Sequence, residues 1–265
     1  GMVRGGRCLD DGEPYIKAAS NAAEFLGQEI YDPVSGILHR IYRNDRSTTE
    51  GFLDDYVYLI CGLLDLYETT FQKRWLQWAE KLQHRQDERF LDSADGGYFT
   101  AAGDSSDVLM RLKEHVDGAL PSPNAVAADN LLRLHQLTGK SQYDQRLNAL
   151  MHCFAAVLEA QPTTVPNLLS AIDASFHSKR QFVFAAQTDD PLLKKMCQAL
   201  HQPFIPYKTI LLMDEPGRSF TDGHRREALR HMIPIDQKAT AYVCEDGWCR
   251  KPTNQLSEFV KLLHP

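Results

Sequence analysis

Residues Asp107–Asn130, DVLMRLKEHVDGALPSPNAVAADN, determine how this chain is organised. The stretch holds a Lys, a Glu, a His, an Asp, a Ser and an Asn in one connection and then begins a helix. Ser122 is a suitable N-cap, and Pro123 suits the first helical position, where its missing N–H leaves no hydrogen bond unmade. We expect this helix to end at Gly139, because glycine readily adopts the left-handed conformation that follows a helix. A further helix is expected over residues 142–159, with Ser141 in a capping box ahead of it.

The helices on both sides of this stretch form an internal repeat. Similar residues are superimposed when residues 50–82 are shifted forward by 68 positions and residues 15–40 by 60. The matches include Leu63, Leu64 and Leu66 on Leu131, Leu132 and Leu134, Trp75 on Tyr143, Asp32 on Asp92, and Gly36 on Gly96. The unit is a helix, a short turn, a second helix and a long loop, and such units bury their apolar faces only by stacking. The first unit shows no leading helix.

Beyond residue 176 the pattern changes to that of a small sheet. Residues 181–186 and 207–213 are apolar runs typical of buried strands, and a helix expected over residues 191–200, capped by Asp190, would make them parallel. The Asp246-Gly247 dipeptide indicates a hairpin turn.

The sequence therefore predicts a mainly α protein with two parts. Helical hairpins are expected over residues 1–176, and a small α/β unit over residues 177–265 is expected to pack on them.

Composition argues against several kinds of partner. With a formal net charge of −6, the chain has no overall electrostatic attraction to nucleic acid or to an anionic membrane. No apolar run approaches the roughly 20 residues of a membrane span. The ten histidines lack metal-ligand spacing, and no glycine-rich phosphate loop is present, so we expect neither a metal nor another cofactor.

The six cysteines are scattered, as is usual for reduced thiols of cytoplasmic proteins. The hairpin turn would place Cys244 opposite Cys249, close enough for a disulfide. In a cytoplasmic chain we favour two packed thiols, with the disulfide as the alternative.

The repeat topology places all the long loops at one end of the stack, so residues 39–55, 98–99 and 113–124 should converge. A polar, sugar-like ligand suits this end, because carboxylates accept hydroxyl hydrogens and aromatic rings stack on sugar C–H surfaces. The candidate acid–base residues are Asp54, Asp55 and Asp117, and the candidate binding residues are Arg40, Tyr56, Tyr98, Lys113, Ser122 and Asn124.

Several of these candidates also have a purely structural interpretation. Asp54 and Asp55 would complement the dipole at the start of a helix, and Asp117 before Gly118 is typical of a turn. Tyr98 is equally typical of a core, and Lys113 of a solvated surface.

Six segments spread over nearly the whole chain are distinctive. They are Leu53-Asp54-Asp55-Tyr56, Gly97-Tyr98-Phe99, Arg111-Leu112-Lys113, Asp117-Gly118-Ala119-x-Pro121-Ser122-x-Asn124, Asn130-Leu131-Leu132-Arg133-Leu134 and Ala239-Thr240-Ala241-Tyr242-Val243-Cys244. Together they resemble the C-terminal part of the spermatogenesis-associated protein 20 and YyaL family. The resemblance implies a partial (α/α)6 toroid of the six-hairpin glycosidase-like type, similar to sugar epimerases and glycan hydrolases. It also implies that a thioredoxin-like domain and the first hairpins are missing here.

Two functional hypotheses follow. The first is a carbohydrate-binding or carbohydrate-active half-toroid, an epimerase or glycan hydrolase that uses acid–base carboxylates. The second is a non-catalytic module that docks to the missing thioredoxin-like and toroid portions or to a second copy of itself, because an open half-toroid would expose apolar surface.

Overall fold

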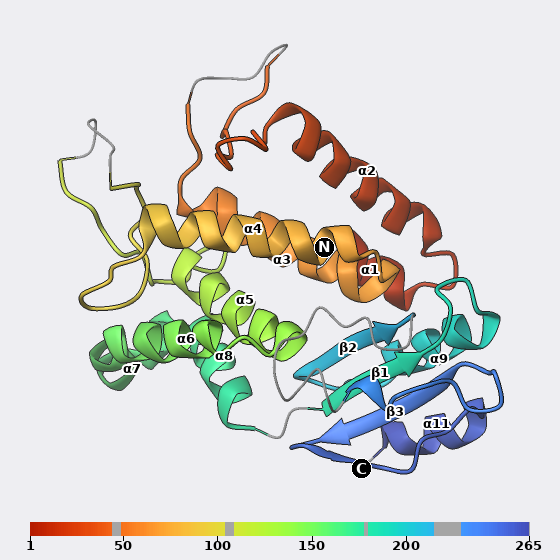
Figure 1. Cartoon of the computed structure of the whole chain (residues 1–265). Helices are drawn as coiled ribbons and strands as arrows, with labels where there is room; N and C mark the ends of the chain where they lie inside the picture. Colours follow the sequence, from red (N-terminus) through yellow and green to blue (C-terminus); the bar gives the residue numbers. More distant parts are fainter. Residues whose placement is uncertain (44–48, 104–108, 178–179, 215–228, 265) are drawn as a thin grey trace.

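The computed structural model describes residues 1–43, 49–103, 109–177, 180–214 and 229–264. Helices dominate the first two thirds of the chain, and a small sheet flanked by helices makes up the described part of the last third (Figure 1). The helices are α1 (Met2–Cys8), α2 (Glu13–Glu29), α3 (Leu53–Thr70), α4 (Lys73–Phe90), α5 (Pro123–Thr138), α6 (Ser141–Cys153), α7 (Ala155–Ala160), η1 (Pro162–Thr164), α8 (Pro166–Phe176), α9 (Pro191–His201) and α11 (Leu256–Leu263). The strands are β1 (Arg180–Ala185), β2 (Lys208–Met213), β3 (Thr240–Glu245) and β4 (Trp248–Cys249).

The pairs α3–α4 and α5–α6 are the predicted helical hairpins. Their turns are equivalent under the 68-residue shift: Phe71 follows α3 with a φ of 56°, and Gly139 follows α5 with a φ of 77°. Glycine adopts this left-handed conformation freely, whereas phenylalanine is strained there. The Phe71 side chain is buried in the apolar core beneath the sheet, which offsets that strain.

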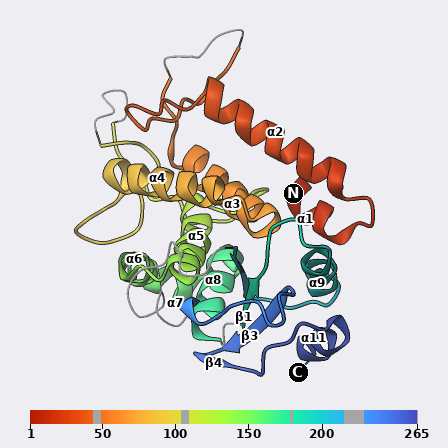
Figure 2. The same ribbon diagram turned by 45° about the vertical axis from the view of Figure 1, so that its right-hand side comes forward.

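Successive hairpins stack through alternate helices. α3 packs on α5, and α5 packs on α8, whereas α4 and α6 pack mainly on their own hairpin partners (Figures 1 and 2). This is the order of inner and outer helices in part of an α/α toroid. The predicted fold class, mainly helical with a small C-terminal α/β unit, is confirmed.

The loops that follow α2 and α4 share one backbone design. Tyr31 bridges Leu38 after α2, and Leu91 bridges Tyr98 after α4. The equivalent residues Asp32 and Asp92 each accept a backbone N–H two positions later, at 3.0 and 2.9 Å. Their glycines, residues 36 and 96, both have positive φ. The internal repeat therefore extends to hydrogen bonding in the loops.

Three predictions about helices are wrong. The first unit does have a leading helix, the seven-residue α1, which packs on α2 and α3. The helix expected over residues 142–159 is broken at Phe154, a buried residue with a φ of −103° and a ψ of 10°, outside the helical region. Ser141 is the first residue of α6 and makes no capping bond; Lys140 precedes the helix.

The sheet has the strand order β2-β1-β3-β4. β1 and β2 are parallel, β3 is antiparallel to β1, and Glu245 pairs with Trp248 across the hairpin turn, as predicted. Asp190 caps α9, accepting N–H groups from Leu192 and Leu193 at 2.7 and 3.2 Å. The β-α-β unit and the hairpin are therefore both present.

The two faces of this sheet lie in different cores. Val183 and Leu211 pack with the helical hairpins, whereas their neighbours Phe182 and Ile210 lie under α9 and α11. α8 ends at Phe176 and β1 begins at Arg180, close to the predicted boundary. A division into separate domains at residues 176 and 177 stays a prediction.

The preference for free thiols at the hairpin is wrong, because Cys244 and Cys249 form a disulfide. The predicted cross-strand register is correct, and it brings the two Cα atoms to 3.9 Å. The cross-strand geometry therefore predicts the state of these two cysteines better than the expected cellular compartment does.

Candidate functional site

The long loops converge at one end of the stack, as predicted. The Leu53 N–H at the start of α3 donates to the Thr100 carbonyl at 3.0 Å, and the Thr100 N–H donates to the Leu112 carbonyl at 2.7 Å. Backbone hydrogen bonds thus join the start of α3 to the long connection between α4 and α5, and join two parts of that connection to each other.

Arg40, Asp54 and Asp55 form one group at this end. Arg40 Nη1 lies 3.1 Å from Asp54 Oδ1 and 2.9 Å from Asp55 Oδ2. Asp55 also accepts the Phe52 N–H at 2.9 Å and so caps α3. Burial and the neighbouring Asp54 raise the pKa of Asp55, against the lowering effects of that hydrogen bond and of Arg40. One guanidinium is therefore shared between two carboxylates.

Tyr56, Tyr98 and Asn124 hold the loops from inside. Tyr56 Oη accepts the Leu38 N–H at 2.9 Å. Asn124 accepts the Tyr98 N–H at 2.9 Å and donates to the Tyr98 carbonyl at 3.0 Å. All three candidates are fully buried, and the Tyr98 hydroxyl donates to Asp87. Their polar atoms thus have partners within the protein.

Lys113 is held by the repeated loop after α4. Its Nζ lies 2.8 Å from Asp92 Oδ2 and donates to the Gly96 carbonyl at 2.7 Å. The hydrogen bond from Lys113, with backbone N–H groups, lowers the pKa of Asp92 to about 2. Lys113 therefore closes this loop.

Asp117 and Ser122 organise the connection into α5. Asp117 accepts the Ser122 N–H at 2.7 Å and the Asn167 N–H at 2.8 Å, one on each carboxylate oxygen. Ser122 Oγ accepts the Ala125 N–H at 3.3 Å, which confirms it as an N-cap. Burial, Asp54 and Asp117 together raise the pKa of Tyr58 on α3, so both carboxylates act on this one tyrosine.

The structure thus brings the candidates together at one end, but each makes contacts that stabilise the loops. Within the described ranges, no three His, Cys, Asp or Glu side chains are grouped so as to hold a metal ion. None of the described helices has the length and apolar character needed to cross a bilayer.

A second polar region, which the sequence did not indicate, lies nearer the sheet. A pocket of about 390 Å³ opens between α1, α3, α5, α8 and the start of β2. Its charged lining residues are Arg4, Arg7, Asp65, Glu68, Asp129, Arg133 and Lys208. Neutral polar residues that line it include Gln136, Asn167, Ser170 and Tyr207.

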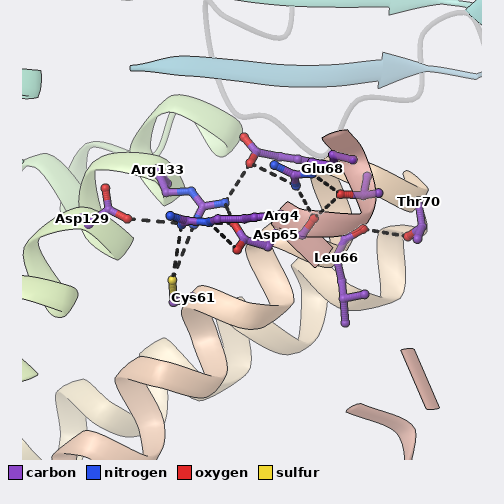
Figure 3. A network of polar contacts seen from close by, with 10 residues as sticks. Arg4, Cys61, Asp65, Leu66, Glu68, Thr70, Asp129 and Arg133 are labelled. Carbon is purple, nitrogen blue, oxygen red and sulfur yellow. Dashed lines mark hydrogen bonds and ion pairs between the residues drawn. The ribbon is translucent and has the colours of Figure 1, made fainter. Parts of the chain in front are cut away.

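Arg133 is at the centre of an ionic network in this pocket (Figure 3). Its Nη2 lies 2.9 Å from Asp65 Oδ1 and 2.8 Å from Glu68 Oε2. Arg4 Nε binds the other oxygen of Asp65 at 2.8 Å, and Arg7 Nη2 lies 3.9 Å from Glu68. The Arg133, Asp65 and Glu68 side chains are only 12%, 7% and 7% exposed. The network therefore joins α1, α3 and α5 through charges that are largely buried, except for Arg4, whose side chain is 60% exposed.

Burial and charge oppose each other at these groups. Burial alone would raise the pKa of Asp65, but Arg133 and Arg4 outweigh it and lower that pKa. Burial raises the pKa of the Cys61 thiol, although Arg133 counteracts it. Both effects describe a site in which the Asp65 carboxylate stays ionised and the Cys61 thiol stays protonated.

One sequence signal could have revealed this network. Asp65 and Arg133 each interrupt a run of leucines, in Leu63-Leu64-Asp65-Leu66 and Leu131-Leu132-Arg133-Leu134, at equivalent positions of the repeat. A charged residue inside an apolar helix face needs a partner when it is buried. Opposite charges at equivalent positions of two stacked units therefore predict an ion pair between those units.

Sequence comparison identifies relatives over nearly the whole chain. Spermatogenesis-associated protein 20 of Homo sapiens is 36% identical over 259 residues, which are 94% of this chain and 33% of the human protein. The Rattus norvegicus protein of the same name is 35% identical over 95% of this chain and 33% of its own length. This chain is homologous to spermatogenesis-associated protein 20. It spans about a third of the length of these relatives.

More distant comparisons add less. An uncharacterized protein of Caenorhabditis elegans is 26% identical over the whole chain and 36% of its own length. Among solved structures, cellobiose 2-epimerase from Spirochaeta thermophila DSM 6192 aligns with 60% of this chain and 43% of its own, at 19% identity and a TM-score of 0.42. At that TM-score the likeness carries no argument about fold or function. No protein-family model matches the sequence.

Proposed function

We propose that this chain binds a sugar-like, polyhydroxylated small molecule in the pocket around Arg133. The observation that carries the proposal is the lining: both carboxylates and guanidinium groups, held in place by one another, surround about 390 Å³. Pockets for small ligands commonly measure about 300–1,000 Å³ and fix their ligands with a few positioned polar groups. Hydroxyl groups both donate and accept, so they match a wall that offers both.

Gln136 provides independent support. Its side chain lines the pocket and is 6% exposed, and its Oε1 accepts the Thr209 hydroxyl at 2.6 Å. Its Nε2 has no hydrogen-bond partner among the described residues. A buried amide left unpaired costs about 1–3 kcal/mol, and rotation of this side chain toward the pocket would let a ligand hydroxyl satisfy it.

The three candidate acid–base carboxylates at the loop end already have partners within the protein. Asp54 pairs with Arg40, Asp55 also caps α3, and both oxygens of Asp117 accept backbone N–H groups. A reaction that used these three carboxylates would have to compete with those contacts. We therefore propose ligand binding in the Arg133 pocket rather than catalysis at the loop end.

The test is a thermal-shift panel of neutral mono- and disaccharides. A ligand at about 100 times its dissociation constant adds about 2.7 kcal/mol, and at this chain length each kcal/mol raises the midpoint by about 2–4 °C. Asn167→Ala removes an amide from the pocket wall, and Asn148→Ala removes an exposed amide from α6. We expect a shift that Asn167→Ala reduces and Asn148→Ala preserves. A flat panel, or equal shifts in both variants, contradicts the proposal.

A second candidate function, self-association, is favoured by a separate apolar groove. The groove, of about 540 Å³, lies between α1, α2 and α3 and is lined by Val3, Ala19, Ala22, Leu26, Leu59 and Leu120, among others. Leu120 and nearby Met2 are 68% and 51% exposed. We propose that a second copy of this chain covers the groove, because exposed apolar patches commonly mark association sites.

Light scattering after size exclusion tests this second proposal. We expect a dimer that Ala22→Glu, in the groove, converts to a monomer. Ala156→Glu, an exposed position on α7, should leave the dimer intact. A monomeric wild type at high concentration would rule the proposal out.

A further inference from the structure

We infer that the ligand of the Arg133 pocket carries an acidic group, a carboxylate or a phosphate ester on a polyhydroxylated body, which binds beside Lys208 and Arg7. The inference rests on the proposed function and narrows its substrate class from sugar-like molecules to acidic ones.

Among the described residues that line the pocket, four are cationic (Arg4, Arg7, Arg133 and Lys208) and three are acidic (Asp65, Glu68 and Asp129). Arg133 is neutralised by Asp65 and Glu68, and Arg4 by Asp65. Lys208, the first residue of β2, also lines the pocket, but it has no carboxylate within ion-pair distance among the described residues. Its hydrogen bond is to the Leu200 carbonyl at 3.3 Å, near the end of α9.

Arg7 adds to the positive charge at this corner. Its guanidinium donates to the Thr69 hydroxyl and to the Asp65 carbonyl, both neutral acceptors, and the Glu68 carboxylate is 3.9 Å away. Burial and Arg7 lower the pKa of Lys208, against the smaller raising effects of Cys8 and Glu68. Burial, Arg7 and Lys208 hold the pKa of nearby His201 at about 3. Arg7 therefore acts on both Lys208 and His201, and the Glu68 carboxylate opposes that effect at Lys208.

A purely structural role explains only part of this arrangement. Lysine near the end of a helix stabilises its last carbonyls, and Lys208 does so for α9. An ammonium group has three N–H donors, however, and Leu200 accepts one. A ligand anion would use the others and would relieve the repulsion from Arg7. A neutral sugar would bring no such gain, so acidic and neutral ligands should differ in affinity.

The experiment is calorimetric titration of the whole chain at constant ionic strength, because salt screens exposed charges. The ligands are glucose, glucuronate, glucose 6-phosphate and inorganic phosphate. We expect at least one of the two acidic sugars to bind about tenfold tighter than glucose, which corresponds to about 1.4 kcal/mol. Glucuronate and glucose 6-phosphate distinguish a carboxylate from a phosphate ester as the acidic group.

Three variants locate the acidic group. Lys208→Gln should abolish the preference for the acidic sugar, and Lys208→Arg should keep it, since the charge is retained. Lys195→Gln, an exposed lysine on the same helix as His201, is the matched control and should behave as wild type. Preservation of the preference in Lys208→Gln, with the fold intact, would overturn the inference.

The titrations distinguish failure of this inference from failure of the proposed function. Equal binding of glucose and the acidic sugars would overturn this inference and leave the proposed function standing. No binding of any sugar would overturn both. Phosphate alone binding as tightly as glucose 6-phosphate would contradict the polyhydroxylated class, because the sugar body would then contribute nothing.

Discussion

Asp65 and Arg133 occupy equivalent positions in successive helical hairpins and form an ion pair of 2.9 Å across the α3–α5 interface. The repeat thus places opposite charges where a simple copy would place like charges. The pair is largely buried, with side chains 7% and 12% exposed. It ties the stacking of the hairpins to the polar pocket.

Arg133→Met should destabilise the protein by about 3–5 kcal/mol, because it leaves the Asp65 and Glu68 carboxylates buried without their main partner. Urea unfolding measures the loss. Asp65→Asn should cost less in the Arg133→Met background than in the wild type, since the uncompensated charge is then removed. Strict additivity of the two substitutions would show that the residues are not coupled.

The exposed pair of Glu258 and Lys261 is the matched control for this prediction. Its side chains are 52% and 72% exposed, at a distance of 2.8 Å. Exposed ion pairs contribute about 0–1 kcal/mol. Lys261→Met should therefore change the free energy of unfolding far less than Arg133→Met.

Asn124→Ala and Tyr56→Phe should both destabilise the loop end. Each removes the acceptor of a buried backbone N–H, that of Tyr98 or of Leu38. An orphaned buried donor costs about 1–3 kcal/mol. Chemical denaturation should show losses in this range, whereas Tyr42→Phe, at a ring 38% exposed, should be close to neutral. Unchanged stability in both variants would point back to a ligand role for these side chains.

His201 should make stability depend on pH below neutrality. Burial, with Arg7 and Lys208, lowers its pKa in the folded chain to about 3. The unfolded chain takes up the proton near pH 6.5, so this contribution is complete above about pH 6.5 and is lost as pH falls toward 3. The loss is about 1.4 kcal/mol for each pH unit below 6.5.

Unfolding free energies at pH 7.0 and 5.5 test this dependence. The decrease between them should be smaller in His201→Gln than in the wild type. His84→Gln removes a ring that is 75% exposed and should follow the wild type. Equal decreases in wild type and His201→Gln would exclude the proposed pH effect.

The disulfide predicts a simple labelling result. Alkylation of the unfolded, unreduced protein should modify four of the six cysteines, namely Cys8, Cys61, Cys153 and Cys197. Prior reduction should raise the number to six, as measured by intact mass. Six labels without reductant would show that Cys244 and Cys249 are thiols.

Local sequence patterns predicted most of the fold. The helix positions, the turn at Gly139, the Asp190 cap and the strand register follow from periodicity and turn chemistry, which act within a few residues. α1 was missed because MVRGGRC has two glycines and no apolar period. Its contacts are tertiary: Arg4 and Arg7 bind acceptors on α3.

The candidate site was harder to predict, because burial is a property of the assembled chain. Tyr98 and Asn124 were correctly placed among converging loops, yet both turn inward and bond to protein atoms. Nothing in the sequence gives a reason to select Lys208 as a site residue. Its electrostatic environment depends on Arg7, which lies 201 positions earlier in the chain. Polar residues can be located from sequence, but their partners come from the fold.

The sheet has a consequence for cooperativity. Alternate side chains of β1 enter two cores, Val183 with the hairpins and Phe182 with α9 and α11. A cut between Phe176 and Arg180 would expose apolar surface on both fragments. The change from helical to α/β pattern in the sequence therefore need not mark a boundary between independently folding units: melting of either part removes half of the support of β1, so the two parts should unfold together.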